Sequence, residues 1–144
     1  MKLSFQEYIS IQIHKTDLKL TSFIKQKLEG FNLAPEQNLI MLLLWEKDGL
    51  TQNQIAQKLG KDKTNIARMA TNLEKKGFVK RITPSNDRRS LQLYLTSAGK
   101  ELGEKVLPIS EEFDEVVCKG LSQDELREFE RILSKINENV QNSR

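Results

Sequence analysis

Residues 51–81 read TQNQIAQKLGKDKTNIARMATNLEKKGFVKR, and this stretch decides the fold. Thr51 is followed three residues later by Gln54, which makes a capping box: each side chain hydrogen-bonds a free backbone amide at the start of a helix. The sequence therefore predicts a helix over 52–59. Gly60 is suited to end that helix in a left-handed conformation.

A second helix is predicted directly after this glycine turn. Asp62 is a favourable N-cap, and Gly77 follows a basic last turn. The apolar residues between them recur at helical spacing and define the face expected to be buried: Ile66, Met69, Ala70 and Leu73. Two short helices joined by a tight glycine turn are typical of a helix-turn-helix.

The hydrophobic period changes after the second helix. Residues 78–83 and 91–95 are strand-like, and in the latter three leucines alternate with a glutamine and a tyrosine. Residues 84–90, PSNDRRS, are rich in turn formers. The sequence therefore predicts a two-stranded β-hairpin, the wing, after the helix-turn-helix.

Helices are expected on both sides of this unit. Residues 5–29 carry apolar side chains at helical spacing and are predicted as one long helix that ends at Gly30. An almost entirely apolar helix begins near Pro35 and is expected to be buried. After the hairpin, Thr96 caps a fifth helix, which Pro108 is expected to bend or restart.

A last helix opens with a second capping box, Ser122 with Glu125. Its apolar residues recur at near-heptad spacing: Leu126, Phe129, Ile132, Leu133, Ile136 and Val140. A thin monomer offers the terminal helices too little surface to cover such faces, so burial between two chains is expected.

The predicted fold class is mainly α with a small β-hairpin wing. We expect one domain over 1–144, with a winged helix-turn-helix lobe at 34–95. A helical dimerisation region is expected at 1–33 and 96–144.

Charge is gathered in one part of the chain. The net charge is only +3, yet residues 58–89 hold ten Lys and Arg against three Asp and Glu. The remaining residues hold 13 basic and 17 acidic side chains and are therefore acidic. An electropositive lobe on an otherwise acidic protein indicates a nucleic-acid partner.

Composition excludes several other classes of protein. No uncharged apolar run approaches 18 residues, so neither a membrane span nor a secretory signal is predicted, and a cytoplasmic location is expected. The single cysteine, Cys118, excludes an internal disulfide and a cysteine-based zinc cluster. The sequence carries no nucleophile and base pair and no glycine-rich phosphate loop, so we predict no enzyme and no cofactor.

The outer face of the second helix of the helix-turn-helix is the expected reader of DNA, because a helix fits the major groove. Base-reading candidates lie together on its first two turns: Thr64, Asn65 and Arg68. Lys61 and Lys63 are expected to contact phosphate. Thr51 and Gln52 are expected to bind a phosphate through backbone amides and side chains.

The tip of the predicted hairpin carries a carboxylate and two guanidinium groups. A hairpin beside the major groove meets the adjacent minor groove, where a guanidinium can enter. We favour Arg89 as the inserting residue and Arg88 as a phosphate contact, with the reverse assignment as the alternative. Asp87 is interpreted as the residue that positions Arg89 or caps the turn.

Residues 51–99 resemble the winged helix-turn-helix of the multiple-antibiotic-resistance regulator (MarR) family. The similarity is carried by the segment 51–81, by Asp87 and Arg89 in the pattern Asp-x-Arg, and by LTSAGKEL at 95–102. It implies a homodimer on a pseudo-palindromic operator, with 63–68 in the recognition helix and Arg89 in the minor groove. Members are usually repressors that a small, often aromatic or anionic, compound releases from DNA.

The resemblance also suggests where an effector would bind. His14, Met41 and Trp45 are candidates for that pocket. The alternatives are a solvated helix histidine for His14 and core packing for the other two. Cys118 lies far from the first helix, where redox-sensing members carry a reactive cysteine, so we favour a core or interface thiol. With one histidine, no metal site is expected.

An alternative function remains open from the sequence. The same fold could dock onto a protein or RNA partner as an interaction module without a specific operator. Such a module would bind duplex DNA weakly, without regard to sequence, and not at physiological salt.

Overall fold

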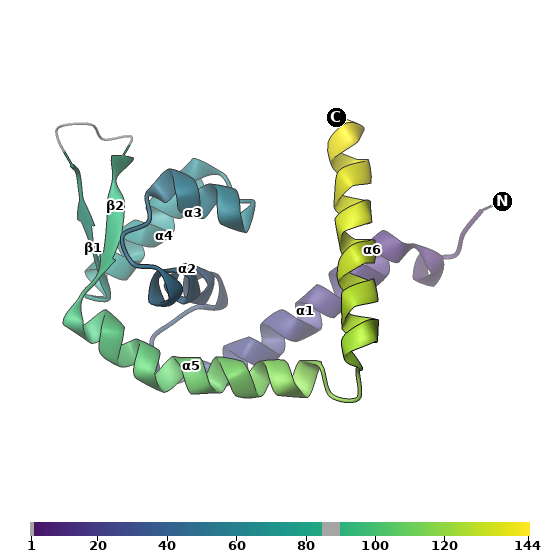
Figure 1. The fold of residues 1–144 in the computed structure, drawn as a ribbon, viewed down its shortest axis with the longest axis horizontal. Coiled ribbons are helices and arrows are strands. Elements are labelled where there is room, and N and C mark those ends of the chain that lie inside the picture. The colour runs from purple at the N-terminus through teal and green to yellow at the C-terminus, as the bar shows by residue number, and fades with distance from the viewer. Residues whose placement is uncertain (1, 85–89) are drawn as a thin grey trace. The chain divides into compact units, whose positions relative to one another are not determined.

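The structure is a computed structural model, and it describes residues 2–84 and 90–144. In these ranges the chain is mainly helical and holds one two-stranded antiparallel sheet, as Figure 1 shows. The fold class predicted from the sequence is thereby confirmed. The elements in chain order are a 3-10 turn η1 (Phe5–Glu7), α1 (Ile9–Lys27), α2 (Pro35–Glu46), α3 (Gln52–Leu59), α4 (Lys63–Lys75), β1 (Val79–Ile82), β2 (Gln92–Leu95), α5 (Ser97–Val117) and α6 (Gln123–Asn142).

The chain divides into two compact units, Met1–Glu111 and Glu112–Arg144, and each is described by itself. In the first unit, α2 to β2 form the winged helix-turn-helix lobe. None of the helices in the described residues is long and apolar enough to cross a bilayer.

Local capping fixes the bounds of α3 and α4. Thr51 Oγ1 accepts the Gln54 amide at 3.1 Å, and Gln54 Oε1 accepts the Thr51 amide at 2.8 Å, which is the predicted capping box. Gly60 ends α3 with a φ of 64°, in the left-handed region that favours glycine. Asp62 Oδ1 accepts the Asn65 amide at 2.8 Å and so begins α4.

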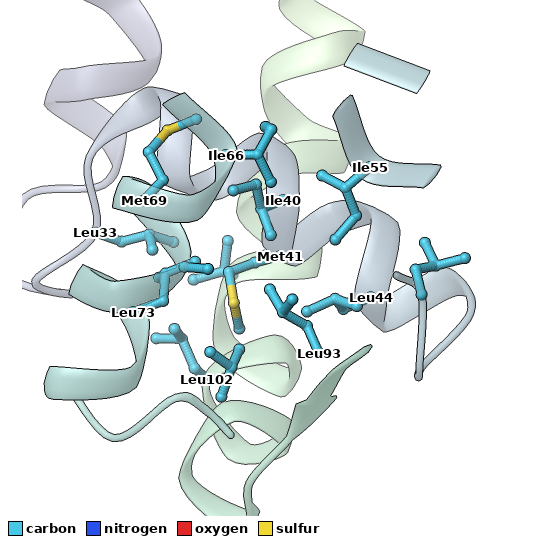
Figure 2. Packing of buried hydrophobic residues seen from close by; sticks show 14 of the residues in the cluster. Leu33, Ile40, Met41, Leu44, Ile55, Ile66, Met69, Leu73, Leu93 and Leu102 are labelled. Atoms are coloured by element: carbon cyan, nitrogen blue, oxygen red, sulfur yellow. The ribbon is translucent and has the colours of Figure 1, made fainter. Parts of the chain in front are cut away.

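One apolar core holds the lobe together. The inner face of α4 is buried as predicted, and α2 contributes Ile40, Met41 and Leu44, each at most 1% exposed. Figure 2 shows these side chains packed with Ile66 and Leu93 from α4 and β2. Burial of this kind is the main stabilising contribution to a small domain.

The hairpin is anchored on both edges of β2. Residues 79–82 pair with 92–95 in antiparallel register, from Val79 opposite Leu95 to Ile82 opposite Gln92. On the other edge, Leu93 exchanges backbone hydrogen bonds with the segment 49–50, at 2.9 and 3.0 Å. The sequence did not predict this pairing, which fixes the start of α3 to the hairpin.

Glycines in α5 allow it to lie against the lobe. A Cβ at Gly99 would collide with the backbone carbonyl oxygen of Phe78, and one at Gly103 would lie 2.7 Å from Trp45 Nε1. The indole instead donates a hydrogen bond to the Gly99 carbonyl at 2.9 Å. These two positions therefore require the smallest residue.

Two boundaries differ from the prediction. The helix expected over 5–29 is interrupted at Tyr8, which is extended, because Ser4 and Glu7 close a separate turn in which Ser4 Oγ donates to Glu7 at 2.7 Å. The same bond lowers the pKa of the Glu7 carboxyl. Of the two outcomes expected at Pro108, a bend or a restart, the restart does not occur, since α5 is continuous through Pro108.

Candidate nucleic-acid interface

The outer face of α4 is polar and open to solvent. Lys63, Thr64 and Arg68 are exposed and Asn65 is half-buried, while the opposite face of the helix lies in the core. The structure thus brings the predicted base-reading residues together on one surface. An α-helix with a cationic outer face suits the major groove of DNA.

Asn65 links two neighbours on this face. Its side-chain nitrogen Nδ2 donates to Asp62 Oδ2 at 3.4 Å, and its oxygen Oδ1 accepts from Arg68 Nη2 at 2.7 Å. Asp62 therefore does more than cap the helix. Sequence reasoning gave it only the capping role, although its three-residue spacing from Asn65 places the two side chains on neighbouring turns.

Several cations of the basic segment, residues 58–89, are engaged inside the fold. Lys61 Nζ lies 3.3 Å from Glu36 Oε1, which joins the turn between α3 and α4 to the first turn of α2. Arg81 pairs with Glu74 at 3.1 Å and joins β1 to α4. The charge that this segment offers to a ligand is therefore smaller than its Lys and Arg content indicates.

Lys76 is engaged in the same way, at the carboxyl end of α4. Its ammonium donates to the Asn32 carbonyl at 2.9 Å and to Gln37 Oε1 at 2.7 Å. Gln37 is buried and also accepts the Ala34 amide at 3.2 Å. Together with the ion pair of Lys61, this contact ties both ends of α4 to the beginning of α2.

The expected phosphate contacts at the start of α3 need a correction. The Thr51 amide donates to Gln54 Oε1, and the Gln52 amide donates to the Leu91 carbonyl at 2.9 Å. Both backbone amides named in the prediction are thus already hydrogen-bonded within the fold. Binding of a phosphate here would rest on the side chains of Thr51 and Gln52, both half-buried.

The three residues expected at the hairpin tip, Asp87, Arg88 and Arg89, lie outside the described residues. The strands that lead to them are described and pair up to Ile82 and Gln92. The assignment of a minor-groove arginine therefore stays a prediction.

The three expected effector residues occupy different environments. His14 is exposed on α1. Met41 is fully buried in the core and offers no surface to a ligand, and Trp45 is half-buried with its indole nitrogen bonded to the backbone of α5. Core packing thus accounts for Met41, and much of Trp45.

The remaining chemistry of the described residues is sparse. In the ranges 2–84 and 90–144, no group of three or more His, Cys, Asp or Glu is placed to hold a metal ion. Burial raises the pKa of the Cys118 thiol, and the neighbouring Asp114 carboxylate, 3.8 Å away, raises it further. The thiolate is the reactive form of cysteine, and both effects disfavour it.

Comparison with known proteins finds a matching family model and similar regulators of transcription. The model of the MarR family matches residues 33–91, which span α2 to β1 and end just before β2. A transcriptional repressor of Escherichia coli K12, MprA, is 34% identical over 110 residues, covering 76% of this chain and 62% of MprA. The chain therefore spans about three fifths of the length of that relative.

For two further similar proteins, the matched region is a larger share of the protein's own length. The organic hydroperoxide resistance transcriptional regulator of Bacillus subtilis is 30% identical over 109 residues, which are 76% of this chain and 73% of that protein. Among solved structures, a DNA complex of Staphylococcus aureus MepR superposes with a TM-score of 0.84 at 27% identity, covering 95% of this chain and 99% of MepR. The two curated relatives are named as a transcriptional repressor and a transcriptional regulator, and the prediction that this chain is not an enzyme agrees with these names.

Proposed function

The chain belongs to the MarR family, and we propose that it is a transcriptional regulator that binds double-stranded DNA at a specific operator. One observation carries the proposal: α4 is divided into a buried apolar face and an exposed face that bears Lys63, Thr64 and Arg68. Lysine and arginine donate to the acceptors that guanine presents in the major groove. A helix divided in this way enters the groove without disturbing the core.

In the proposed complex, α4 is the recognition helix. Arg68 reads base edges, while Lys63 contacts a phosphate on the flanking DNA backbone. Lys61 reaches a phosphate only after it leaves its ion pair with Glu36. The side chains of Thr51 and Gln52 add contacts to the phosphate backbone of the DNA. At the wing, Arg89 enters the adjacent minor groove.

We propose that the regulator is a homodimer. In α6, all of whose residues are described, none is buried, and Phe129, Ile132 and Val140 are exposed. The amino-terminal segment likewise exposes apolar side chains, among them Phe5 and Ile9. A second copy of the chain would cover such faces, and two-fold symmetry would set two recognition helices about 34–36 Å apart on a pseudo-palindromic operator.

We further propose that the regulator is a repressor. Support comes from the name of the E. coli relative, a transcriptional repressor. Release by a small aromatic or anionic effector is the part of the proposal that rests on family resemblance. His14, being exposed, is the candidate contact with free access to such a compound.

The test is to select binding sites from genomic fragments and to measure affinity for the selected site with Arg68→Ala. We expect a loss of about tenfold or more, because a good arginine contact to a guanine contributes roughly 1–3 kcal/mol. Lys100→Ala is the matched control: it removes an exposed positive charge from α5, and wild-type affinity is expected. Both variants should melt as the wild type does.

Two outcomes would contradict the proposal. Weak binding without sequence preference, lost at physiological salt, would contradict the operator and favour the interaction module. A selected site without dyad symmetry would contradict the dimer.

A further inference from the structure

We infer that Asn65 is a positioning residue that holds Arg68 for a guanine, and does not itself read a base. The inference rests on the proposed function, because it assigns roles within the DNA-reading face of α4. It revises the expectation that Thr64, Asn65 and Arg68 all contact bases.

The chemistry of its two partners, Asp62 and Arg68, fixes the orientation of the Asn65 side-chain amide. The Asp62 carboxylate only accepts hydrogen bonds, and the Arg68 guanidinium only donates them. Asn65 therefore turns Nδ2 toward Asp62, at 3.4 Å from Oδ2, and Oδ1 toward Arg68, at 2.7 Å from Nη2. Its backbone amide is also held, at 2.8 Å from Asp62 Oδ1. The residue is thus fixed at three points.

Arg68 keeps most of its donors in this arrangement. A guanidinium has five N–H groups, and a guanine edge takes two of them, at O6 and N7. One donor given to Asn65 leaves enough for a bidentate contact. Because the guanidinium is already oriented, binding a base costs less side-chain entropy than it would for a free arginine.

Asn65 itself is less suited to reading a base. Recognition of adenine by asparagine uses both the side-chain oxygen and the side-chain nitrogen. Each atom is already bonded to a neighbour on the helix and keeps one further N–H or lone pair, whose direction those bonds fix. The two roles thus predict different base preferences. If Asn65 positions Arg68, the pair prefers a guanine; if Asn65 itself reads a base, an adenine is preferred in addition.

The experiment measures base preference at every operator position for four proteins: wild type, Asn65→Ala, Arg68→Ala and the double variant. We expect both single variants to lose preference for the same G·C pair. Asn65→Ala should weaken operator binding about fivefold in the wild-type background and less than about twofold when Arg68 is already alanine, since residues that act together are not additive. A structural role alone would not remove preference at one base pair.

A second variant separates helix capping from the positioning of Arg68. Asp62→Ser keeps an oxygen for the Asn65 backbone amide but removes the second carboxylate oxygen, which holds Nδ2. We expect an unchanged melting temperature and part of the specificity loss of Asn65→Ala. Asn65→Asp keeps an acceptor for Arg68 and is expected to retain the G·C preference better than Asn65→Ala does.

The outcomes distinguish the two levels of the proposal. If Asn65→Ala removes preference at a base pair that Arg68→Ala leaves unchanged, or costs the same in both backgrounds, Asn65 reads a base and the inference is wrong while the regulator stands. If the wild-type protein shows no base preference at any position, the proposed function fails and the inference fails with it.

Discussion

The helices α4 and α6 begin with similar caps, but their apolar faces lie in opposite environments. Both have a side-chain cap: Asp62 Oδ1 accepts the Asn65 amide at 2.8 Å, and Ser122 Oγ accepts the Glu125 amide at 3.1 Å. Both carry an apolar stripe at helical spacing. Yet the stripe of α4 is buried in the lobe, whereas Phe129 on α6 is 57% exposed.

Amphipathic spacing therefore identifies the apolar face of a helix but not the surface that covers it. The stripe of α4 packs on α2 and β2 of its own chain, so its outer face is free for recognition. The stripe of α6 lacks such cover in the described residues of its own unit. Under the proposed function, α4 serves the ligand and α6 serves a second copy of the chain.

The buried face of α4 is expected to be sensitive to truncation of a side chain. Leu73→Ala removes a side chain that is 0% exposed and leaves a cavity. We expect a loss of about 2–5 kcal/mol in the free energy of unfolding, independent of protein concentration. Urea denaturation of wild type and variant measures it. Asn72→Ala, an exposed neighbour, is the control, and equal effects of the two substitutions would contradict the described packing.

Truncation of an apolar side chain on α6 is expected to affect association instead of folding. Phe129→Ala is expected to leave helix content unchanged and to weaken self-association about 30-fold. The reason is that a symmetric dimer loses the partner contact twice, at about 1 kcal/mol for each half-exposed ring. Sedimentation velocity over a range of concentrations measures the shift. Glu130→Ala changes an exposed neighbour and should not alter association; a monomer at all concentrations in the wild type would overturn the proposed dimer.

The sequence predicted best those features that neighbouring residues determine. The bounds of α3 followed from Thr51 and Gln54, which lie three residues apart and satisfy each other. The buried face of α4 followed from its period, because residues three and four apart share a side of a helix. For the same reason, the outer face of α4 and its main candidates could be identified from the sequence.

Features that join distant segments escaped prediction. The pairing of 49–50 with Leu93 and the bond from Lys76 to Gln37 bridge about 40 residues, and no periodic pattern indicates either. The charge of Lys76 is therefore engaged within the fold, although the sequence places it in the basic segment. The Gln52 amide is engaged for a similar reason, since its acceptor, the Leu91 carbonyl, comes from the hairpin.

A smaller effect is expected on stability in acid, where a carboxylate on α4 is compared with one on α6. The backbone amide of Arg81 donates to the Glu74 carboxylate at 3.1 Å and, with the guanidinium, lowers the pKa of that carboxyl. Because its pKa is lower in the folded state, the contribution of Glu74 to stability is fully present above the ordinary glutamate pKa of about 4.3. It is lost as the pH falls through the lower, folded-state value.

Glu74→Gln should therefore make the free energy of unfolding of the lobe less sensitive to acid. The change should be below about 1 kcal/mol, because the Glu74 side chain is 40% exposed and water screens its ion pair with Arg81. Melting curves between neutral pH and pH 3 measure the slope. Glu128→Gln on α6 is the matched control: a side-chain hydrogen bond from Arg131 lowers the pKa of Glu128 too, but both residues lie on one helix. Glu74 instead joins α4 to β1, so only its protonation weakens a contact between elements of the lobe. Equal slopes for Glu74→Gln and wild type would show that this contact contributes nothing to the attachment of the hairpin.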